Sequence, residues 1–325
     1  MRARVLLTNP IHPEHQANLA KHVEVVLADD VSPQTLRKAA ADCDAMIVRT
    51  HLPEDVFEDA PRMKYVVRHG VGVDMIPVDR ATELGIVVAN LPGANTAAVT
   101  EYALAAIFQV NRPIVAYDQA LRAQSWDVAK SLSTKNNEIA GSVCGIIGVG
   151  AIGQRLAGIL MAMGVTVLGH TRRPETLPEG VEAVSFEELL KRSDTIVLAC
   201  PLNDQTYHLI NAQAIAAMKP GVTLINVARG AVIDHTALVP ALQSGQVGAA
   251  VLDVHEPAIL TGQEAILSCP NTLLTAHQAG ITATTLERLS REAVNSLLSL
   301  INGENQANVV NPAAWEMFHV KHSKS

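Results

Sequence analysis

Short apolar runs alternate with polar, helix-forming stretches along the first third of the chain. Five runs rich in β-branched residues are expected to be strands, at positions 5–8, 23–27, 45–48, 65–67 and 86–89. Helices are expected between them, at 15–21, 33–41, 54–59 and 77–83, with start signals such as Ser32-Pro33. Strands that alternate with helices at this spacing predict a parallel sheet with helices on both faces.

The pattern changes after Asn95, where one long helical stretch is expected to run to Arg122, centred on residues 97–117. A second series of apolar runs predicts strands at 143–147, 165–168, 195–198, 223–226, 249–252 and 272–275. A second long amphipathic helix, 282–300, follows this series, since its apolar residues recur at helical spacing. The two long helices bracket the second series, which indicates a domain inserted into the first.

The expected fold class is therefore α/β, with two doubly wound parallel-sheet domains. A flavodoxin-like domain is formed by residues 1–96 and 285–325, and the inserted domain by residues 97–284. The tail after Asn311, with His319, Lys321, His322 and Lys324, is expected to be a frayed terminus.

Composition agrees with this architecture and excludes several classes of function. The chain has 325 residues, 48% of them hydrophobic and only 3% aromatic, as expected of parallel sheets built from aliphatic residues. A formal net charge of −7 and the absence of a Lys/Arg run argue against nucleic acid as a partner. The four scattered cysteines suggest neither disulfides nor a metal site, and no apolar stretch is long enough for a bilayer. We expect a soluble cytoplasmic protein without a membrane or metal partner.

A glycine motif marks the start of the inserted domain. Gly148, Gly150 and Gly153 form G-x-G-x-x-G between an expected strand and an expected helix. Gly148 permits a tight turn, Gly150 lets the backbone approach a pyrophosphate, and Gly153 allows the helix to pack closely on the strand. Unpaired N–H groups at the N-terminus of this helix would bind the phosphates. The inserted domain is therefore expected to be a Rossmann dinucleotide-binding domain.

The residues after the next strand bear on which dinucleotide is bound. NAD sites usually carry an acidic residue there, which holds the ribose 2′-hydroxyl. This chain has Thr171, Arg172 and Arg173 instead. Guanidinium groups at this position pair with a 2′-phosphate, so we expect NADP to be preferred over NAD. The alternative is a solvated arginine pair on a surface turn.

Further motifs follow one another in an order typical of one family. They are Val71-Gly72-Val73-Asp74, residues 90–95 with Glu101, the glycine motif, Asn226-Val227-Ala228-Arg229-Gly230, Leu252-Asp253-Val254 and Leu274-Thr275-Ala276-His277. The chain in this respect resembles the D-isomer-specific 2-hydroxyacid dehydrogenases over nearly its whole length. The family includes phosphoglycerate, glyoxylate/hydroxypyruvate, D-lactate, formate and phosphite dehydrogenases. The resemblance implies a substrate domain split by a nucleotide domain, and a homodimer.

The chemistry of 2-keto acid reduction explains two of these residues. The reaction needs a cation for the carboxylate and carbonyl, and a proton donor for the developing alkoxide. Arg229 follows an expected strand, and the resemblance makes it the substrate arginine. His277 also follows an expected strand, and the motif identifies it as the acid/base. The hydride is thus expected to move between NAD(P)H and C2 of a small 2-keto or 2-hydroxy acid.

The third catalytic residue departs from the family pattern. Family members carry a glutamate five residues after the aspartate of Leu-Asp-Val, where this chain has Ala258. Glu256 lies two residues earlier, and a local shift of the loop would make it the partner of His277. The alternatives are Glu264 of the same loop, or no carboxylate partner and a slow enzyme.

The resemblance also implies the remaining ligands. The amides of Val71, Gly72 and Val73 would receive the substrate carboxylate, and Arg49 would bind a distal anionic group. Residues matching those that line the dinucleotide are Ala151, Ile152, Cys200, Pro201, Val227, Ala228 and Asp253. Glyoxylate, hydroxypyruvate and phosphoglycerate are the substrates considered, and formate or phosphite donors are not excluded by the motifs. The alternative function is an NAD(P)H-binding redox sensor or co-repressor-like protein with little turnover.

Overall fold

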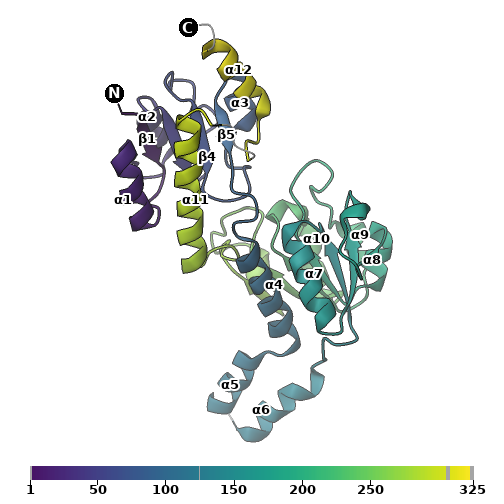
Figure 1. Cartoon of the computed structure of the whole chain (residues 1–325). Helices are drawn as coiled ribbons and strands as arrows, with labels where there is room; N and C mark the ends of the chain where they lie inside the picture. Colours follow the sequence, from purple (N-terminus) through teal and green to yellow (C-terminus); the bar gives the residue numbers. More distant parts are fainter. Residues whose placement is uncertain (1, 124, 305–307, 323–325) are drawn as a thin grey trace. The chain divides into compact units, whose positions relative to one another are not determined.

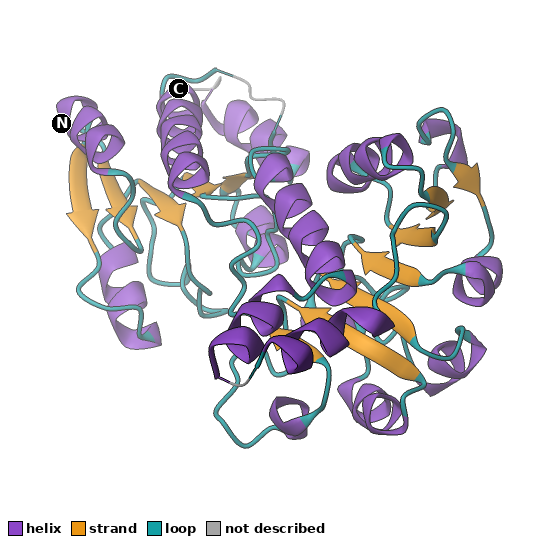
Figure 2. Ribbon diagram, turned by 90° about the horizontal axis from the view of Figure 1, so that it is seen from below, coloured by secondary structure: helices purple, strands orange, loops and turns teal. Residues whose placement is uncertain are grey.

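The computed structural model describes residues 2–123, 125–304 and 308–322, and the chain divides into two compact units (Figure 1). The first unit consists of Met1–Asn95 and Ile281–Ser325, and the second of Thr96–Gly280. Each unit contains one parallel sheet flanked by helices, as Figure 2 shows. The expected fold class is therefore confirmed.

The first unit contains a five-stranded sheet in the order β2-β1-β3-β4-β5. Its strands are β1 (Arg4–Leu7), β2 (Glu24–Leu27), β3 (Ala45–Val48), β4 (Tyr65–Arg68) and β5 (Val87–Ala89). Its helices are α1 (Pro13–His22), α2 (Pro33–Ala40), α3 (Val78–Glu83), α11 (Ala283–Ile301) and α12 (Pro312–His322). This strand order is that of the flavodoxin-like fold.

Alternate side chains of these strands form two cores, one on each face of the sheet. In β1, Leu7 packs in a cluster that includes Leu19 of α1 and Leu297 of α11, whereas Leu6 packs with Leu36 of α2. The central positions of these strands are consequently apolar, which is why they appear as apolar runs in the sequence. The charged residues Arg4, Glu24 and Arg68 lie at strand ends.

Two expectations for this unit are wrong. Residues 54–59 form turns rather than a helix. The tail is not frayed from Asn311, because α12 continues to His322 and Ala314 is fully buried in the α1 and α11 core. Lys324 lies outside the described residues.

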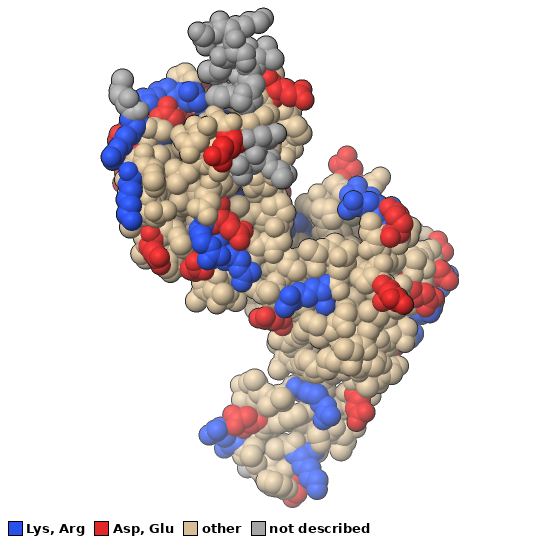
Figure 3. Space-filling view, viewed as in Figure 1, with Lys and Arg blue, Asp and Glu red and all other residues tan. Residues whose placement is uncertain are grey.

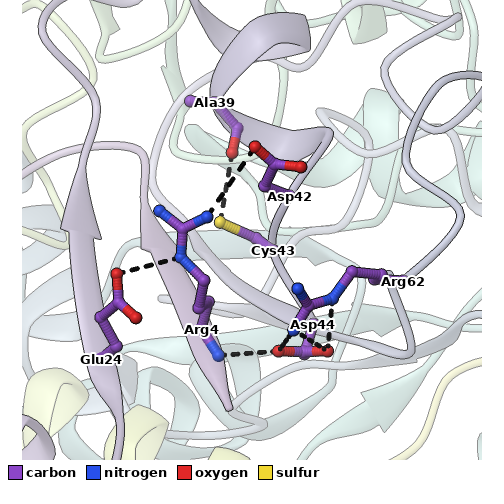
Figure 4. Close-up of polar contacts among 7 residues, drawn as sticks. All are labelled: Arg4, Glu24, Ala39, Asp42, Cys43, Asp44 and Arg62. Carbon is purple, nitrogen blue, oxygen red and sulfur yellow. Dashed lines mark hydrogen bonds and ion pairs between the residues drawn. The ribbon is translucent and has the colours of Figure 1, made fainter. Parts of the chain in front are cut away.

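Charged residues at the amino ends of the strands join the sheet to its loops (Figure 4). The guanidinium of Arg4 bonds Glu24 on the neighbouring strand (3.0 Å) and lies 3.8 Å from Asp42. The carboxylate of Asp44 accepts a bond from the backbone N–H of Arg4 (2.8 Å) and pairs with Arg62 (2.8 Å). The first residues of β1 and β3 are thereby held in register.

The second unit contains a seven-stranded sheet in the order β12-β11-β10-β9-β6-β7-β8. Its strands are β6 (Val143–Ile147), β7 (Thr166–His170), β8 (Glu182–Ala183), β9 (Thr195–Leu198), β10 (Val222–Asn226), β11 (Val247–Leu252) and β12 (Thr272–Leu274). Its α-helices are α4 (Thr96–Asn111), α5 (Ile114–Ala123), α6 (Trp126–Leu132), α7 (Ala151–Ala162), α8 (Phe186–Arg192), α9 (Ala212–Ala217) and α10 (His235–Ser244). The strand order reverses between β6 and β9, as in a Rossmann domain, and ligands bind at such a switch point.

This sheet also separates two cores. Ile146 and Val197 pack in a cluster with Leu156 of α7 and Ile107 of α4. On the other face, Ile196 and its neighbours pack with α8, α9 and α10. The short strand β8, which pairs with β7 through Glu182 and Ala183, was not expected from the sequence.

The single helical stretch expected from Asn95 to Arg122 is in fact two helices. Helix α4 ends at Asn111 and α5 begins at Ile114, because Pro113 lacks the N–H that would continue the helix. Helices α5 and α6 then lie side by side as a hairpin beyond the end of α4 (Figure 1). Large apolar side chains of this hairpin are exposed, among them Ile114 (68%) and Trp126 (70%).

Acidic and basic side chains are interspersed over the face shown in Figure 3, with no continuous basic area. Among the described residues, no helix is both long and apolar enough to cross a membrane.

Candidate active site

The loop after β6 brings the backbone close to the end of β9. Gly148 has a φ of +92°, and a Cβ there would lie 2.5 Å from the backbone nitrogen of Cys200. Its amide donates to the carbonyl of His170 at the end of β7 (2.9 Å). A side chain would clash and would strain the positive φ, so this position requires glycine.

The remaining glycines of the motif form the start of α7. Gly150 is the N-cap, and a Cβ on it would meet no heavy atom within 4 Å. A Cβ on Gly153 would lie 2.6 Å from the carbonyl oxygen of Gly148. Ala151 and Ile152 begin the helix, whose first N–H groups have no helical acceptor. Open space beside Gly150 at a helix N-terminus fits a dinucleotide pyrophosphate.

The loop after β7 carries the residues expected to select the cofactor. Thr171 accepts a bond from the amide of Arg173 (3.4 Å), and Arg172 and Arg173 are both exposed. In the part of the chain that the structure describes, neither guanidinium has an ion-pair partner. The loop after β7 is therefore positively charged, and it begins next to His170, whose carbonyl bonds Gly148.

The other predicted cofactor residues also lie at the carboxyl ends of the strands, as the glycine loop does. Cys200 and Pro201 follow β9, with Cys200 buried and Pro201 exposed. Burial raises the pKa of the Cys200 thiol, so this thiol stays protonated at neutral pH. Val227 and Ala228 follow β10.

Arg229 lies directly after this turn, in a loop fixed by a buried asparagine. Asn226, at the end of β10, accepts a bond from the amide of Ala228 (2.9 Å) and donates one to the carbonyl of Arg229 (2.9 Å). The Arg229 guanidinium bonds the carbonyl of Ala228 through Nη1 (2.7 Å). The backbone and the guanidinium of Arg229 are thus held before any ligand binds.

The Arg229 loop packs directly on the loop after β11. A Cβ on Gly230 would lie 1.9 Å from the carbonyl oxygen of His255 and 2.7 Å from the amide nitrogen of Glu256. No larger residue fits at position 230. This contact brings two of the predicted catalytic residues, Arg229 and Glu256, onto adjoining loops.

Glu256 has a partner that the sequence did not indicate. Its Oε2 lies 2.7 Å from Nε2 of His208, and Tyr207 stacks on the His208 ring with centroids 4.0 Å apart. His208 is brought there because its amide donates to the carbonyl of Ala231, beside the Arg229 loop (2.8 Å).

Two further histidines lie in this region, His255 buried and His235 half-buried. His255 bonds the carbonyl of Thr275 through Nε2 (2.8 Å), and its ring lies edge-on to that of His235 at 6.5 Å. Burial, with the neighbouring His255, lowers the pKa of His235. Among the described residues, no set of three His, Cys, Asp or Glu side chains is arranged to hold a metal ion.

His277 is exposed on the loop after β12 and has a φ of +55°. Its amide donates to the carbonyl of Asp253 at the end of β11 (2.7 Å). The Asp253 carboxylate, predicted to line the cofactor, accepts bonds from the amides of Gln278 (2.7 Å) and Ala279 (2.9 Å). Asp253 therefore fixes the loop that carries His277.

Glu264, the alternative partner for His277, is used within its own loop. Its carboxylate accepts bonds from the amides of Thr261, Gly262 and Gln263 and from the Thr261 hydroxyl, at 2.8–3.1 Å. These bonds lower its pKa to about 2. Glu264 is therefore ionised at all ordinary pH values and is a poor proton donor.

In the first unit, the loop after β4 has its carbonyl groups bonded. The carbonyl of Val71 accepts from Asn90 (2.7 Å), that of Gly72 from Nε of Arg68 (3.1 Å), and that of Val73 from the amide of Ile76 (2.9 Å). No described residue accepts a hydrogen bond from the amides of Val71, Gly72 and Val73. Three consecutive N–H groups without protein acceptors suit an anion.

Arg49 lies in the same unit, after β3. Its backbone amide donates to the hydroxyl of Thr8 (2.9 Å), and its Nη1 bonds the carbonyl of Pro10. Partial burial lowers the pKa of its guanidinium, and no described carboxylate pairs with it. A half-buried cation without a counter-ion favours an anionic ligand.

Sequence reasoning missed the residues that support these groups. Arg68 fixes the amide loop, Asn226 fixes the arginine loop, and His208 bonds Glu256. Asn226 is the first residue of a motif noted in the sequence, but its supporting role was not predicted. Arg68 ends β4 close to the motif that begins at Val71, which was an available signal. His208 had no such signal, since it lies 48 residues from Glu256.

The strand order and the glycine loop define a dinucleotide-binding protein of the Rossmann class, with ionisable groups at the same edge of its sheet. The sequence model for the D-isomer-specific 2-hydroxyacid dehydrogenase NAD-binding domain matches residues 104–279. Glyoxylate reductase of Aeropyrum pernix is 34% identical, over 95% of this chain and 96% of its own. D-3-phosphoglycerate dehydrogenase of Mycobacterium leprae is also 34% identical, over 94% of this chain but 58% of its own.

A solved structure agrees with these relatives. The NADPH-dependent glyoxylate/hydroxypyruvate reductase of Sinorhizobium meliloti, in complex with NADP and malonate, superposes with a TM-score of 0.84 at 29% identity. The alignment covers 97% of this chain and 98% of that one. The chain belongs to the D-isomer-specific 2-hydroxyacid dehydrogenase family. It is an NAD(P)-dependent oxidoreductase of 2-hydroxy acids, as the sequence predicts.

Proposed function

We propose that this enzyme reduces a small 2-keto acid at C2 to the D-2-hydroxy acid, with Arg229, Glu256 and His277 as its catalytic residues. One observation carries the proposal: these residues follow the adjacent parallel strands β10, β11 and β12, at the edge of the sheet where the glycine loop also lies. Ligands of doubly wound sheets bind at this edge. The first unit is then the substrate domain and the second the dinucleotide-binding domain.

Arg229 is proposed to bind the substrate carboxylate and polarise the carbonyl. A guanidinium offers five N–H donors in a plane and matches a carboxylate with two parallel bonds. Two hydrogen bonds support this role: Nη1 of Arg229 bonds the Ala228 carbonyl, and Asn226 bonds the Arg229 carbonyl. They hold the arginine in place beforehand, so that less conformational entropy is lost when the substrate binds.

His277 is proposed to donate the proton to the alkoxide oxygen and to take it back in the reverse direction. Glu256 is proposed as its carboxylate partner. Oε2 of Glu256 bonds His208, which orients the carboxylate and leaves Oε1 for a second donor. The carboxylate of Glu264 is already bonded within its own loop, which supports Glu256 rather than Glu264 as the partner of His277.

The amides of Val71, Gly72 and Val73 are proposed to receive the substrate carboxylate in the first unit, and Arg49 a second anionic group when one is present. The amides have no protein acceptor and the guanidinium has no counter-ion among the described residues. Changing Arg49 to Ala is expected to raise KM for phosphorylated hydroxy acids far more than for glyoxylate.

Gly148, Gly150, Ala151, Ile152 and Gly153 are proposed to hold the cofactor pyrophosphate. The lining residues proposed with them are Cys200, Pro201, Val227, Ala228 and Asp253. When bound, the nicotinamide cofactor supplies or accepts the hydride. The open space at Gly150 and the helix N-terminus of α7 support this site.

NADP is proposed as the preferred cofactor, through Thr171, Arg172 and Arg173. The two guanidinium groups are exposed and carry no described ion pair, so a 2′-phosphate would gain two cationic partners. Replacing both arginines with Ala is expected to lower the ratio of NADPH to NADH efficiency at least tenfold. An unchanged ratio would show that the pair is surface charge only.

The substrate is proposed to be glyoxylate, hydroxypyruvate or a similar short 2-keto acid. Support comes from the full-length similarity to a glyoxylate reductase, whereas the phosphoglycerate dehydrogenase matches over only 58% of its length. The test is a panel of 2-keto acids, with formate, phosphite and phosphoglycerate in the oxidative direction, assayed with both cofactors. Tight cofactor binding without turnover on the panel would favour a redox sensor instead.

A homodimer in the cytoplasm is proposed as the working form. The α5–α6 hairpin exposes Ile114, Val115 and Trp126, which a second copy would cover. All four cysteines are free and buried, as expected in a reducing compartment. Sedimentation of Trp126→Glu tests the first point: a dimer that persists would place the interface elsewhere. On the face that Figure 3 shows, acidic and basic side chains are mixed, which supports the proposal that neither nucleic acid nor a membrane is a partner.

A further inference from the structure

Asp253 is a buried carboxylate that takes part in three hydrogen bonds. The side chain is 1% exposed. Oδ1 accepts from the hydroxyl of Thr275 (2.6 Å) and from the amide of Gln278 (2.7 Å), and Oδ2 accepts from the amide of Ala279 (2.9 Å). All three partners are donors, so both carboxylate oxygens act as acceptors within this loop.

The same residue controls the backbone of His277. The Asp253 carbonyl accepts from the amide of His277 (2.7 Å), while its carboxylate holds the two amides that follow. Between these bonds His277 adopts a φ of +55°, which residues with a side chain rarely adopt. The direction in which the imidazole leaves the loop therefore depends on Asp253.

A tyrosine from another part of the unit completes this arrangement. The hydroxyl of Tyr102, on α4, lies 2.6 Å from the hydroxyl of Thr275. Thr275 has a single hydroxyl proton and donates it to Asp253, so Tyr102 must be the donor to Thr275. The bonds then run in one direction, from Tyr102 to Thr275 to the carboxylate, and each strengthens the next. Burial, opposed only in part by the Thr275 bond, raises the pKa of Tyr102, which keeps this proton in place.

We propose that Tyr102 and Thr275 are positioning residues for the reaction, acting through Asp253 to hold His277 in its strained backbone conformation. The inference rests on the proposed role of His277 as acid/base. Three of the roughly four acceptor positions of the Asp253 carboxylate are filled by this loop, so one remains for the cofactor contact proposed above. Neither Tyr102 nor Thr275 touches the reacting atoms in this scheme.

The test compares Thr275→Val with Thr275→Ser. Valine keeps the shape of threonine and removes the hydroxyl, so kcat is expected to fall roughly tenfold with little change in the KM of the keto acid or in NADPH affinity. Serine keeps the hydroxyl and is expected to retain most of kcat. Tyr102→Phe removes the outer bond only, and a loss of about threefold is expected.

The matched control is Thr272→Val. This threonine lies at the other end of β12 and donates to the carbonyl of Cys269 (3.0 Å), away from the Asp253 network. It is expected to change thermal stability as much as Thr275→Val does and to leave kcat unaltered. Equal loss of kcat in Thr275→Val and Thr275→Ser, or wild-type kcat in Thr275→Val, would overturn the proposal.

Hydrogen–deuterium exchange of the peptide covering residues 275–280 gives a readout that does not need turnover. The amides of His277, Gln278 and Ala279 are the ones bonded to Asp253, so Thr275→Val is expected to speed their exchange and Thr275→Ser is not. If the wild-type protein reduces no keto acid, this measurement still decides the positioning role, and unchanged exchange in Thr275→Val refutes it. If exchange responds but no protein turns over, only the proposed function fails.

Discussion

The two sheets of this molecule are built alike at their amino ends. In the first unit, Asp44 precedes β3, accepts a bond from the amide of Arg4 and donates its own amide to the carbonyl of Arg4 (both 2.8 Å). In the second, Asp194 precedes β9 and exchanges the same two bonds with Val143 at the start of β6 (both 2.9 Å). Each aspartate thus ties together the first residues of two neighbouring strands.

Each of these two aspartates also pairs with a cationic side chain that precedes the next strand of its sheet. Asp44 pairs with Arg62 before β4, and Asp194 pairs with Lys219 before β10, each at 2.8 Å. The two aspartates differ in solvent exposure, since the side chain of Asp44 is 19% exposed and that of Asp194 45%. The shared arrangement is therefore expected to stabilise the first unit more than the second.

The carboxyl ends differ completely. Those of the first unit carry the amide loop of Val71–Val73 and the half-buried Arg49, whereas those of the second carry the glycine loop, Arg229 and His277. In a doubly wound sheet, the amino ends of the strands thus carry bonds that stabilise the sheet, and the carboxyl ends are available for ligands. The predictions below test this division, beginning with the largest effect.

Changing His277 to Asn is expected to lower kcat by about 10²–10⁴-fold, because an amide cannot supply a proton near neutral pH. NADPH affinity, measured by fluorescence, is expected to remain within about twofold. Loss of cofactor binding in this variant would show that the loop, rather than the proton, is what His277 contributes.

Changing Arg229 to Lys keeps the charge but removes the paired donors, and kcat/KM is expected to fall about 10²–10³-fold. The control is Lys219→Ala at the opposite edge of the same sheet, which is expected to leave kcat/KM unchanged. A comparable loss in both variants would contradict the division between the two edges.

Changing Asp44 to Asn is expected to lower the free energy of unfolding of the first unit by about 1–3 kcal/mol, since an amide NH₂ would face the donors of Arg4 and Arg62. Steady-state kinetics of the folded variant are expected to match the wild type. Thermal unfolding followed by circular dichroism measures the first quantity.

The same change at Asp194 is expected to cost less, about 1 kcal/mol or below, because the pair with Lys219 is more exposed to solvent. The two aspartates are matched in their backbone bonds, so the comparison isolates exposure. Equal losses at both positions would mean that the backbone bonds dominate.

The smallest expected effect concerns acid. Burial alone would raise the pKa of Asp44, but the amide of Arg4 and the guanidinium of Arg62 outweigh it and hold this pKa below the ordinary 3.8. The stability from this group is therefore complete above about pH 4 and is lost as pH falls through the lowered pKa. The thermal midpoint of the wild type is expected to fall more steeply with acid than that of Asp44→Asn, and parallel curves would contradict this assignment.

The fold was predictable because both faces of each sheet are covered, so most strands contain a run of apolar residues, with charged residues such as Arg4 and Arg68 at strand ends. The glycine loop was predictable because its three glycines lie within six residues at a fixed spacing, although the contact that requires glycine at position 148 is with the distant Cys200. The break at Pro113 was not expected, since the helical pattern of apolar residues continues across it. Helix α12 was not expected either, because it is stabilised by burial of Ala314 in the core of the first unit. The pair of Glu256 with His208 depends on how two distant loops meet, which no local pattern records.

Asn226 is fully buried, and every polar group of its side chain is engaged: the oxygen accepts from Ala228 and the nitrogen donates to Arg229. Among side chains of this size, only an amide both accepts and donates in this way. Aspartate would lose the donor, and serine would not reach. In a saturation library, position 226 is thus expected to tolerate almost no substitution, although it contacts no ligand itself. A change of substrate by substitutions around Arg229 is therefore expected to require that Asn226 is retained.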